Sequence, residues 1–320
     1  MRVPLKATFF VGAFMLLFTV CTASAQTVGI QGRRASLLEW YPQTFNLPGI
    51  TNTHSACFDG ANVWVTSIGS NTVSKVQATT GAVLGTYPAG SGAAGCAFDG
   101  GNVWVADFFG GTVTKIDASS GATVGTFSTS GVNPYDVTIE SKYVWVSNNG
   151  SGAVAKLVAS SGALVGTYSV GAQYPHSMAF DGTYLWVTVQ GNNTVAKLRA
   201  STGVLVAAYS VGNTPWGMAF DGINIWVANN GSNTVTELLA SSGAVEATIP
   251  VASGPGAVTF DGLYVWVGNS GSNTVTKLLA SSGAVVWTYP IGGAPLSDMA
   301  FDSAYIWIPW GTSVTRIPTL

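Results

Sequence analysis

The octapeptide "FDGANVWV", residues 58–65, decides the fold because the chain repeats it. Close copies and two weaker ones, "IESKYVWV" and "FDSAYIWI", begin at Phe98, Ile139, Phe180, Phe220, Phe260 and Phe301. The seven starting residues, which we call anchors, are spaced 40 or 41 residues apart. A fixed period of this length, built from strand-forming residues, is typical of a β-propeller in which each repeat is one four-stranded blade.

The repeat around Phe220 shows the expected blade in full. "WGMAF" predicts the first strand, and the Asp-Gly pair that follows it is a strong hairpin signal. "INIWVAN" is apolar almost throughout, as expected for a strand that is buried on both faces. "TVTELLA" and "VEATIPV" predict the third and fourth strands, with the turn "SSGA" between them.

One Trp and one Asp recur at fixed places in the repeat. A Trp in each second strand is expected to fill the gap between adjacent twisted sheets, because a buried aromatic side chain covers a large area. The Asp of the first turn is expected to accept backbone N–H groups of the hairpin. The residues are Trp64, Trp104, Trp145, Trp186, Trp226, Trp266 and Trp307, and Asp59, Asp99, Asp181, Asp221, Asp261 and Asp302.

The two ends of the repeat region predict how the ring closes. The last repeat, from Asp298 onward, has room for three strands, whereas "QTFNLPG" at residues 43–49 resembles the fourth-strand pattern "GTYSVG" at residues 166–171. We therefore expect the N-terminal segment to supply the outer strand of the last blade and to remove an open sheet edge. The predicted fold is all-β: a single seven-bladed propeller of four-stranded antiparallel blades within residues 26–320.

Residues 1–25 are predicted to be a signal peptide. Arg2 and Lys6 precede an apolar run, and Ala23-Ser24-Ala25 matches a small-x-small cleavage site before Gln26. A membrane anchor is the alternative interpretation. No later segment approaches 18 uninterrupted apolar residues, so we expect no membrane span in the mature protein and a secreted or periplasmic location.

The composition limits the partners. Only 8% of residues are charged and 47% are hydrophobic, and loss of two cations with the leader changes the formal charge from -2 to -4. No basic run is present, so nucleic-acid binding is not expected. Export permits a disulfide between Cys57 and Cys96. These residues precede their anchors by one and two positions and should face opposite sides of their strands, so a disulfide and a pair of buried thiols both stay open.

Segments such as "WVANNGSNTVTELLASSGAVEATIPV" resemble the YVTN-repeat (YncE-like) β-propellers, and the resemblance covers roughly residues 36–320. It implies an exported seven-bladed propeller, often without known catalysis. A more distant resemblance to virginiamycin B (streptogramin) lyases implies His and Glu side chains converging near the channel. The mature chain has two His and only four Glu (Glu39, Glu140, Glu237 and Glu246), with no paired motif, so we assign no catalytic residue, metal or cofactor.

Positions that vary between repeats indicate a binding face at one mouth of the central channel. Four residues before the anchors stand His54, Ala94, Tyr135, His176, Trp216, Gly256 and Ser297. Asp136 and Asp298 hold the next position, and loops after two second strands add Asp107, Phe108, Phe109 and Trp310. The predicted ligand-binding residues are His54, Asp107, Phe108, Tyr135, Asp136, His176, Trp216, Asp298 and Trp310.

Such an aromatic and hydroxyl-rich mouth suits a glycan, a peptide or a protein partner. Non-catalytic binding in the cell envelope or outside the cell is therefore the first hypothesis. The alternative is a lyase or hydrolase of the streptogramin-lyase type that uses Asp136 and His176. A structural surface protein that self-associates is a third hypothesis, which the sequence does not separate from the first.

A ring of cations also recurs in the third strands. Lysines hold one position in five repeats and Arg316 holds it in the last, whereas Glu237 is the exception. We expect these side chains to be structural, with stems covering apolar surface while the charges reach water.

Overall fold

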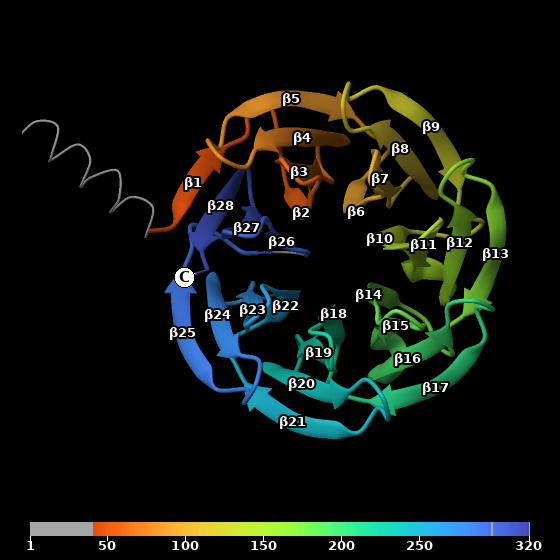
Figure 1. Ribbon diagram of the computed structural model, residues 1–320, viewed down its shortest axis with the longest axis vertical. Helices are drawn as coiled ribbons and strands as arrows, with labels where there is room; N and C mark the ends of the chain where they lie inside the picture. Colours follow the sequence, from red (N-terminus) through yellow and green to blue (C-terminus); the bar gives the residue numbers. More distant parts are fainter. Residues whose placement is uncertain (1–40, 296, 320) are drawn as a thin grey trace, which may run out of the picture. The chain divides into compact units, whose positions relative to one another are not determined.

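The computed structural model describes residues 41–295 and 297–319. These residues form seven four-stranded antiparallel sheets arranged in a ring, which confirms the predicted seven-bladed propeller (Figure 1). The predicted signal peptide lies outside the described residues. Within the described part of the chain, no helix is long and apolar enough to cross a membrane.

Each blade begins with a strand at the centre of the ring and continues outward (Figure 1). The innermost strands are β2 (Thr53–Phe58), β6 (Ala93–Phe98), β10 (Pro134–Glu140), β14 (Pro175–Phe180), β18 (Pro215–Phe220), β22 (Pro255–Phe260) and β26 (Ala300–Phe301). The second strands are β3 (Asn62–Ser67), β7 (Asn102–Asp107), β11 (Tyr143–Asn148), β15 (Tyr184–Val189), β19 (Asn224–Asn229), β23 (Tyr264–Asn269) and β27 (Tyr305–Trp310). We number the blades 1 to 7 in this order.

The outer half of each blade follows the same plan. The third strands are β4 (Thr72–Gln77), β8 (Thr112–Asp117), β12 (Ala153–Val158), β16 (Thr194–Arg199), β20 (Thr234–Leu239), β24 (Thr274–Leu279) and β28 (Ser313–Pro318). The outer strands are β5 (Val83–Pro88), β9 (Thr123–Ser128), β13 (Leu164–Ser169), β17 (Leu205–Ser210), β21 (Val245–Pro250), β25 (Val285–Pro290) and β1 (Gln43–Asn46). Two single-turn 3-10 helices, η1 (Asn149–Ser151) and η2 (Gln190–Asn192), follow β11 and β15.

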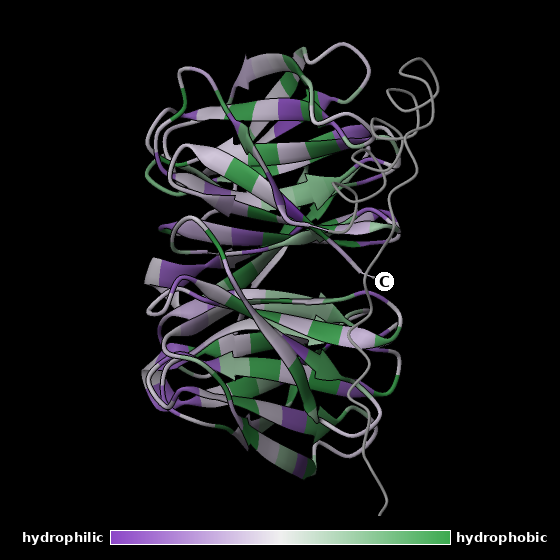
Figure 2. Cartoon of the chain, turned by 90° about the vertical axis from the view of Figure 1, so that its left-hand side faces the viewer, coloured by the Kyte–Doolittle hydropathy of each residue, from purple (hydrophilic) through white to green (hydrophobic). Residues whose placement is uncertain are grey.

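Burial along the strands follows from their place in the blade. The second strands are buried at nearly every position. Most outer strands begin with two exposed residues and then alternate between half-buried and exposed residues. Figure 2 shows hydrophobic and hydrophilic residues as bands along the strands. Strands packed between two sheets need apolar side chains on both faces, which is why the second strands read as apolar runs.

The recurring Asp and Trp act together. All seven repeat Trp side chains are fully buried, as predicted. In blade 5, Asp221 accepts the backbone N–H groups of Ile223 and Asn224 with one oxygen, and the indole N–H of Trp226 with the other at 2.7 Å. Equivalent bonds recur in five more blades, and Glu140 replaces the Asp in blade 3. The Asp and the Trp keep a fixed five-residue separation because one carboxylate caps the turn and also accepts the buried indole N–H group.

The ring closes as predicted. β1 pairs with β28, so that the sheet of blade 7 has the order β1-β28-β27-β26. Phe45 of β1 stacks on Trp307 at 5.6 Å between ring centroids, and it also touches Gly81 of blade 1. The N-terminal strand thus joins the last blade to the first.

Cys57 and Cys96 form a disulfide between β2 and β6, with their Cα atoms 5.8 Å apart. Their different offsets from the anchors place them on opposite sides of their strands. In a ring, opposite sides of neighbouring blades face each other, and this difference is what brings the two sulfur atoms together. The disulfide links blades 1 and 2 near the channel.

The third-strand cations hold neighbouring blades together. Each side chain reaches the next blade and donates to a backbone carbonyl oxygen there: Lys75 to Ala118, Lys115 to Ala159, Lys156 to Ala200, Lys197 to Ala240, Lys277 to Thr319 and Arg316 to Ala78. We call this contact a clasp. The expectation that the charges reach water was wrong, because four of the five lysines are 93–97% buried and hydrogen-bonded instead.

Candidate functional site

Four side chains from four blades meet at the channel mouth. His54, Tyr135, His176 and Trp216, which we call the aromatic cluster, come from the first residues of β2, β10, β14 and β18. Ring centroids lie 5.1 Å apart for His54 and Tyr135, 3.8 Å for Tyr135 and His176, and 5.0 Å for His176 and Trp216. The cluster therefore spans from blade 1 to blade 5 across the mouth.

The phenol of Tyr135 is the hydrogen-bonding centre of the cluster. Its oxygen accepts the indole N–H of Trp216 at 3.3 Å and lies 3.1 Å from Nε2 of His54. Nδ1 of His54 and Nδ1 of His176 are buried and have no hydrogen-bond partner among the described residues. A buried nitrogen acceptor without a partner costs less free energy than a buried N–H group without a partner. The geometry therefore favours the neutral tautomer of His54 that carries its proton on Nε2.

Burial controls the ionisation of the cluster. It lowers the pKa of His54 to about 4, and burial with the neighbouring His54 lowers the pKa of His176. The pKa of Tyr135 is raised by burial and by the carboxylates of Asp298 and Asp136. At neutral pH all three side chains are thus uncharged.

Phe108 extends the cluster from blade 2. Its ring lies 5.9 Å from that of Tyr135 and 5.2 Å from that of Phe109, which is 67% exposed. The loop after β7 therefore adds an apolar edge beside the mouth.

A cavity of about 410 Å³ follows the channel below the cluster, bordered by all seven blades. Asp136 and Asp298 face it, together with Met178, Met218 and Met299. The pKa of Asp136 is raised by burial and by the charge of Asp298, and the pKa of Asp298 is raised by burial. Two carboxyl groups in one desolvated space disfavour ionisation of both, so this pair binds protons more readily than ordinary carboxylates.

The two carboxyl groups have different partners. Both oxygens of Asp136 accept backbone N–H groups, from Val137 and Met178, each at 2.7 Å. Asp298 accepts the hydroxyl groups of Ser55 at 3.0 Å and Ser297 at 3.4 Å. Asp136 is thus fixed by the backbone, whereas Asp298 is held by side chains that can rotate.

Asp107 and Trp310 take other positions. Asp107 is fully buried and accepts the backbone N–H of Gly90 and the hydroxyl groups of Thr112 and Thr114, which makes it part of a turn. Burial raises its pKa to about 6. Trp310 packs on Gly292 and Gly293 of the preceding loop and donates its indole N–H to Thr315. Neither residue contacts the aromatic cluster through any described ring contact or hydrogen bond.

The channel cavity is what the sequence analysis missed. Its signal was present in the Met that stands two residues before three anchors, in "SMAF", "GMAF" and "DMAF". Met is a flexible side chain that often lines adaptable binding surfaces. Among the described residues, no three His, Cys, Asp or Glu side chains come together as a metal site.

Replacing Asp298 by Asn is expected to stabilise the protein relative to wild type as the pH rises from 4 to 8. A raised carboxyl pKa contributes stability that is complete below the unfolded pKa and is lost as the pH rises through the folded pKa. The amide of the Asp298→Asn variant does not ionise, so it would escape this loss and still accept a hydroxyl group. Urea unfolding of wild type and Asp298→Asn across this pH range measures the difference.

Asp136→Asn provides the matched comparison. One backbone N–H would face an amide NH2 group instead of a carboxylate oxygen, an unsatisfied contact that costs about 1–3 kcal/mol. We expect Asp136→Asn to be less stable than Asp298→Asn at every pH. A growing deficit of Asp298→Asn relative to wild type at pH 8 would contradict the assignment.

Comparisons with known proteins found similarity in structure but not in sequence family. No family model and no curated protein matches the chain. Virginiamycin B lyase from Staphylococcus aureus is similar in structure, with a TM-score of 0.77 and 19% identity over 88% of this chain and 99% of the lyase. A further streptogramin B lyase structure gives 0.75 and 17% over 87% and 98%. Hydrazine synthase of Kuenenia stuttgartiensis gives 0.75 and 19% over 86% and 97%. Lyases and a hydrazine synthase are similar at this level, so the chain shares with them a propeller fold.

Proposed function

We propose that the protein is an exported, non-catalytic binding protein of the YVTN-repeat kind that holds a glycan or peptide at the channel mouth. The observation that carries the proposal is the aromatic cluster. The propeller does not require it, because Ala94 and Gly256 hold the same repeat position in blades 2 and 6. Residues that repeat architecture leaves unexplained, in a concave mouth, are the default candidates for binding.

The chemistry of the site supports a ligand rich in hydrogen-bond donors. Nδ1 of His54 and Nδ1 of His176 are buried polar atoms without a hydrogen-bond partner among the described residues, and the carboxyl group of Asp298 lines the cavity. The channel cavity lies next to the cluster rather than being lined by it, and its volume of about 410 Å³ is within the range of roughly 300–1,000 Å³ for small-molecule sites. Sugar hydroxyl or peptide N–H groups supply such donors, and rings of the cluster can pack on their apolar faces.

The alternative function, a lyase or hydrolase, has less support. It pairs Asp136 with His176 as acid and base, but both oxygens of Asp136 accept backbone N–H groups. A general base must reach its proton within hydrogen-bonding distance. The similar lyases are under 20% identical to this chain, and no catalytic residue is carried over from them.

A thermal-shift screen with envelope glycans and short peptides tests the proposal on residues 26–320. We expect a ligand that raises Tm for wild type but not for His176→Ala/Trp216→Ala. At about 100 times Kd, binding adds roughly 2.7 kcal/mol to stability. Tyr174→Ala/Trp287→Ala is the control, since both aromatics are more than half exposed and lie outside the cluster. A silent panel, or equal shifts in both double variants, would overturn binding at the mouth.

A further inference from the structure

The ring of clasps is broken at one junction. Six of the seven neighbouring blade pairs are joined by a cation that donates to a carbonyl oxygen of the next blade. Between blades 5 and 6 the cation position is Glu237. The carbonyl oxygen that a clasp would reach belongs to Ala280, and no Lys or Arg among the described residues donates to it.

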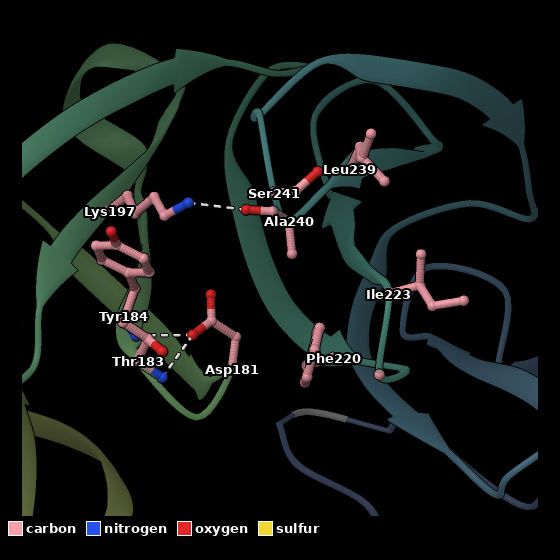
Figure 3. A pocket seen from close by; sticks show the side chains of 10 residues that line it. Asp181, Thr183, Tyr184, Lys197, Phe220, Ile223, Leu239, Ala240 and Ser241 are labelled. Carbon is pink, nitrogen blue, oxygen red and sulfur yellow. Dashed lines mark hydrogen bonds between the residues drawn. The ribbon is translucent and has the colours of Figure 1, made fainter.

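The occupied groove between blades 4 and 5 shows what a cation meets there (Figure 3). Nζ of Lys197 donates to the carbonyl oxygen of Ala240 at 2.8 Å. The ammonium also lies 4.2 Å from the ring centroid of Tyr184 and 4.5 Å from that of Trp186. Asp181 lines the same groove and adds negative charge. The groove thus offers a carbonyl oxygen, two ring faces and a carboxylate to one ammonium group.

The groove between blades 5 and 6, which we call the 5/6 groove, has the corresponding carbonyl oxygen and carboxylate without the cation, but Asn224 stands where blade 4 has Tyr184. It has a volume of about 430 Å³ and is lined by Asp221, Asn224, Glu237, Leu263 and Ala280 among others. Cations lie over the repeat Trp in the other six blades, but no described cation lies over Trp226.

The polar groups of the 5/6 groove include an acceptor that lacks a hydrogen-bond donor. Asn224 donates its amide to Glu237 at 2.7 Å, and its Oδ1 is a buried acceptor without a partner. Burial, Asp221 and Glu246 raise the pKa of Glu237. Asp221 and Glu237 thus line the groove together, and no Lys or Arg of the described residues lines it.

We propose that the 5/6 groove binds a primary alkylammonium group from outside the protein. The ammonium takes the place that the cation holds in the other junctions, donating to the carbonyl oxygen of Ala280 and to the carboxylate of Glu237, which both line the groove. Its alkyl stem leaves along Ile223 and Leu263, which are 66% and 55% exposed. The shared chemistry is that of a lysine side chain or of a free polyamine.

Titration with n-butylammonium chloride at constant ionic strength tests the site, with calorimetry and Tm as readouts. Tetramethylammonium chloride is the chemical control, because it carries the charge but donates no hydrogen bond. We expect n-butylammonium to bind wild type and tetramethylammonium to bind at least about tenfold more weakly, as loss of charge-assisted hydrogen bonds implies.

Two variants at one position separate the site from general charge effects. Glu237→Lys supplies the missing clasp covalently, so we expect a higher Tm and no response to n-butylammonium. Glu237→Gln keeps the size but removes the charge, so binding should weaken about tenfold or more. Asp117→Asn removes one carboxylate from an exposed turn of blade 2 and should bind as wild type does.

The outcomes are distinguishable. Absence of n-butylammonium binding to wild type, or unchanged binding to Glu237→Gln, would overturn the proposal even if Glu237→Lys did not fold. Tighter binding of spermidine than of Nα-acetyl-lysine methylamide would assign a free polyamine as the source. The reverse order would assign a lysine side chain of a partner. The site is separate from the channel mouth, so His176→Ala/Trp216→Ala should leave this binding unchanged.

Discussion

Deletion of residues 41–48 should lower the free energy of unfolding of the ring by more than about 5 kcal/mol, because it removes two well-packed apolar side chains. Phe45 stacks on Trp307, and Leu47 is only 2% exposed. Arg316 would also lose its hydrogen bond to Gln43, in which a guanidinium N–H group donates to the side-chain oxygen of Gln43 at 2.6 Å. The edge of β28 would be left open, so we expect aggregation as well as lower stability.

Urea unfolding measures the loss of stability, and light scattering measures the aggregation. A synthetic peptide of residues 41–50 provides the control, because it can add back as a strand beside β28. The same peptide with Phe45→Ala should rescue much less. A deletion variant with unchanged unfolding would contradict closure by β1.

Trp186→Ala should cost about 3–5 kcal/mol, the range for truncation of a large buried aromatic side chain. Trp186 is fully buried, stacks on Tyr209 and lies under the ammonium of Lys197. Its loss also leaves Asp181 without the indole N–H that it accepts. The junction between blades 4 and 5 would lose packing, a cation–π contact and a hydrogen bond at once.

Trp287→Ala is the matched control for this loss. Trp287 lies in outer strand β25, is 60% exposed and stacks on Tyr289, so its truncation should cost no more than about 1.5 kcal/mol. Chemical unfolding of the two variants compares the same substitution in two environments. Equal losses would contradict the assignment of the repeat Trp as the contact between blades.

The fold could be predicted because each repeat carries its own local signals. The Asp-Gly turns, the apolar second strands and the 40-residue spacing act within one blade, and the orphan segment at Gln43 was recognisable by comparison with complete repeats. Closure by β1 followed from counting strands. These features depend on contacts between residues that the repeat already places at known positions.

The site was harder to predict because it depends on contacts across the channel. His54 and Tyr135 are 81 residues apart in the sequence. The repeat predicts the position of each residue along the channel axis, but it does not predict which side chains contact each other across the channel. Asp107 was misplaced for a different reason, because its side chain turns into its own hairpin and accepts the hydroxyl group of Thr112. The lysine position was recognised, but the carbonyl oxygen that each lysine meets lies about 43 residues onward in the next blade.

Closure by β1 has a consequence for the order in which the protein is made. Gln43 and Arg316 are 273 residues apart, so β1 leaves the ribosome roughly 14–55 s before its partner at about 5–20 residues per second. Among the strands of residues 41–295 and 297–319, it is the first to be synthesised and the last to be paired. Until then an unpaired strand and an incomplete blade must be kept from other chains, which makes the interval before closure the period of greatest exposure to aggregation.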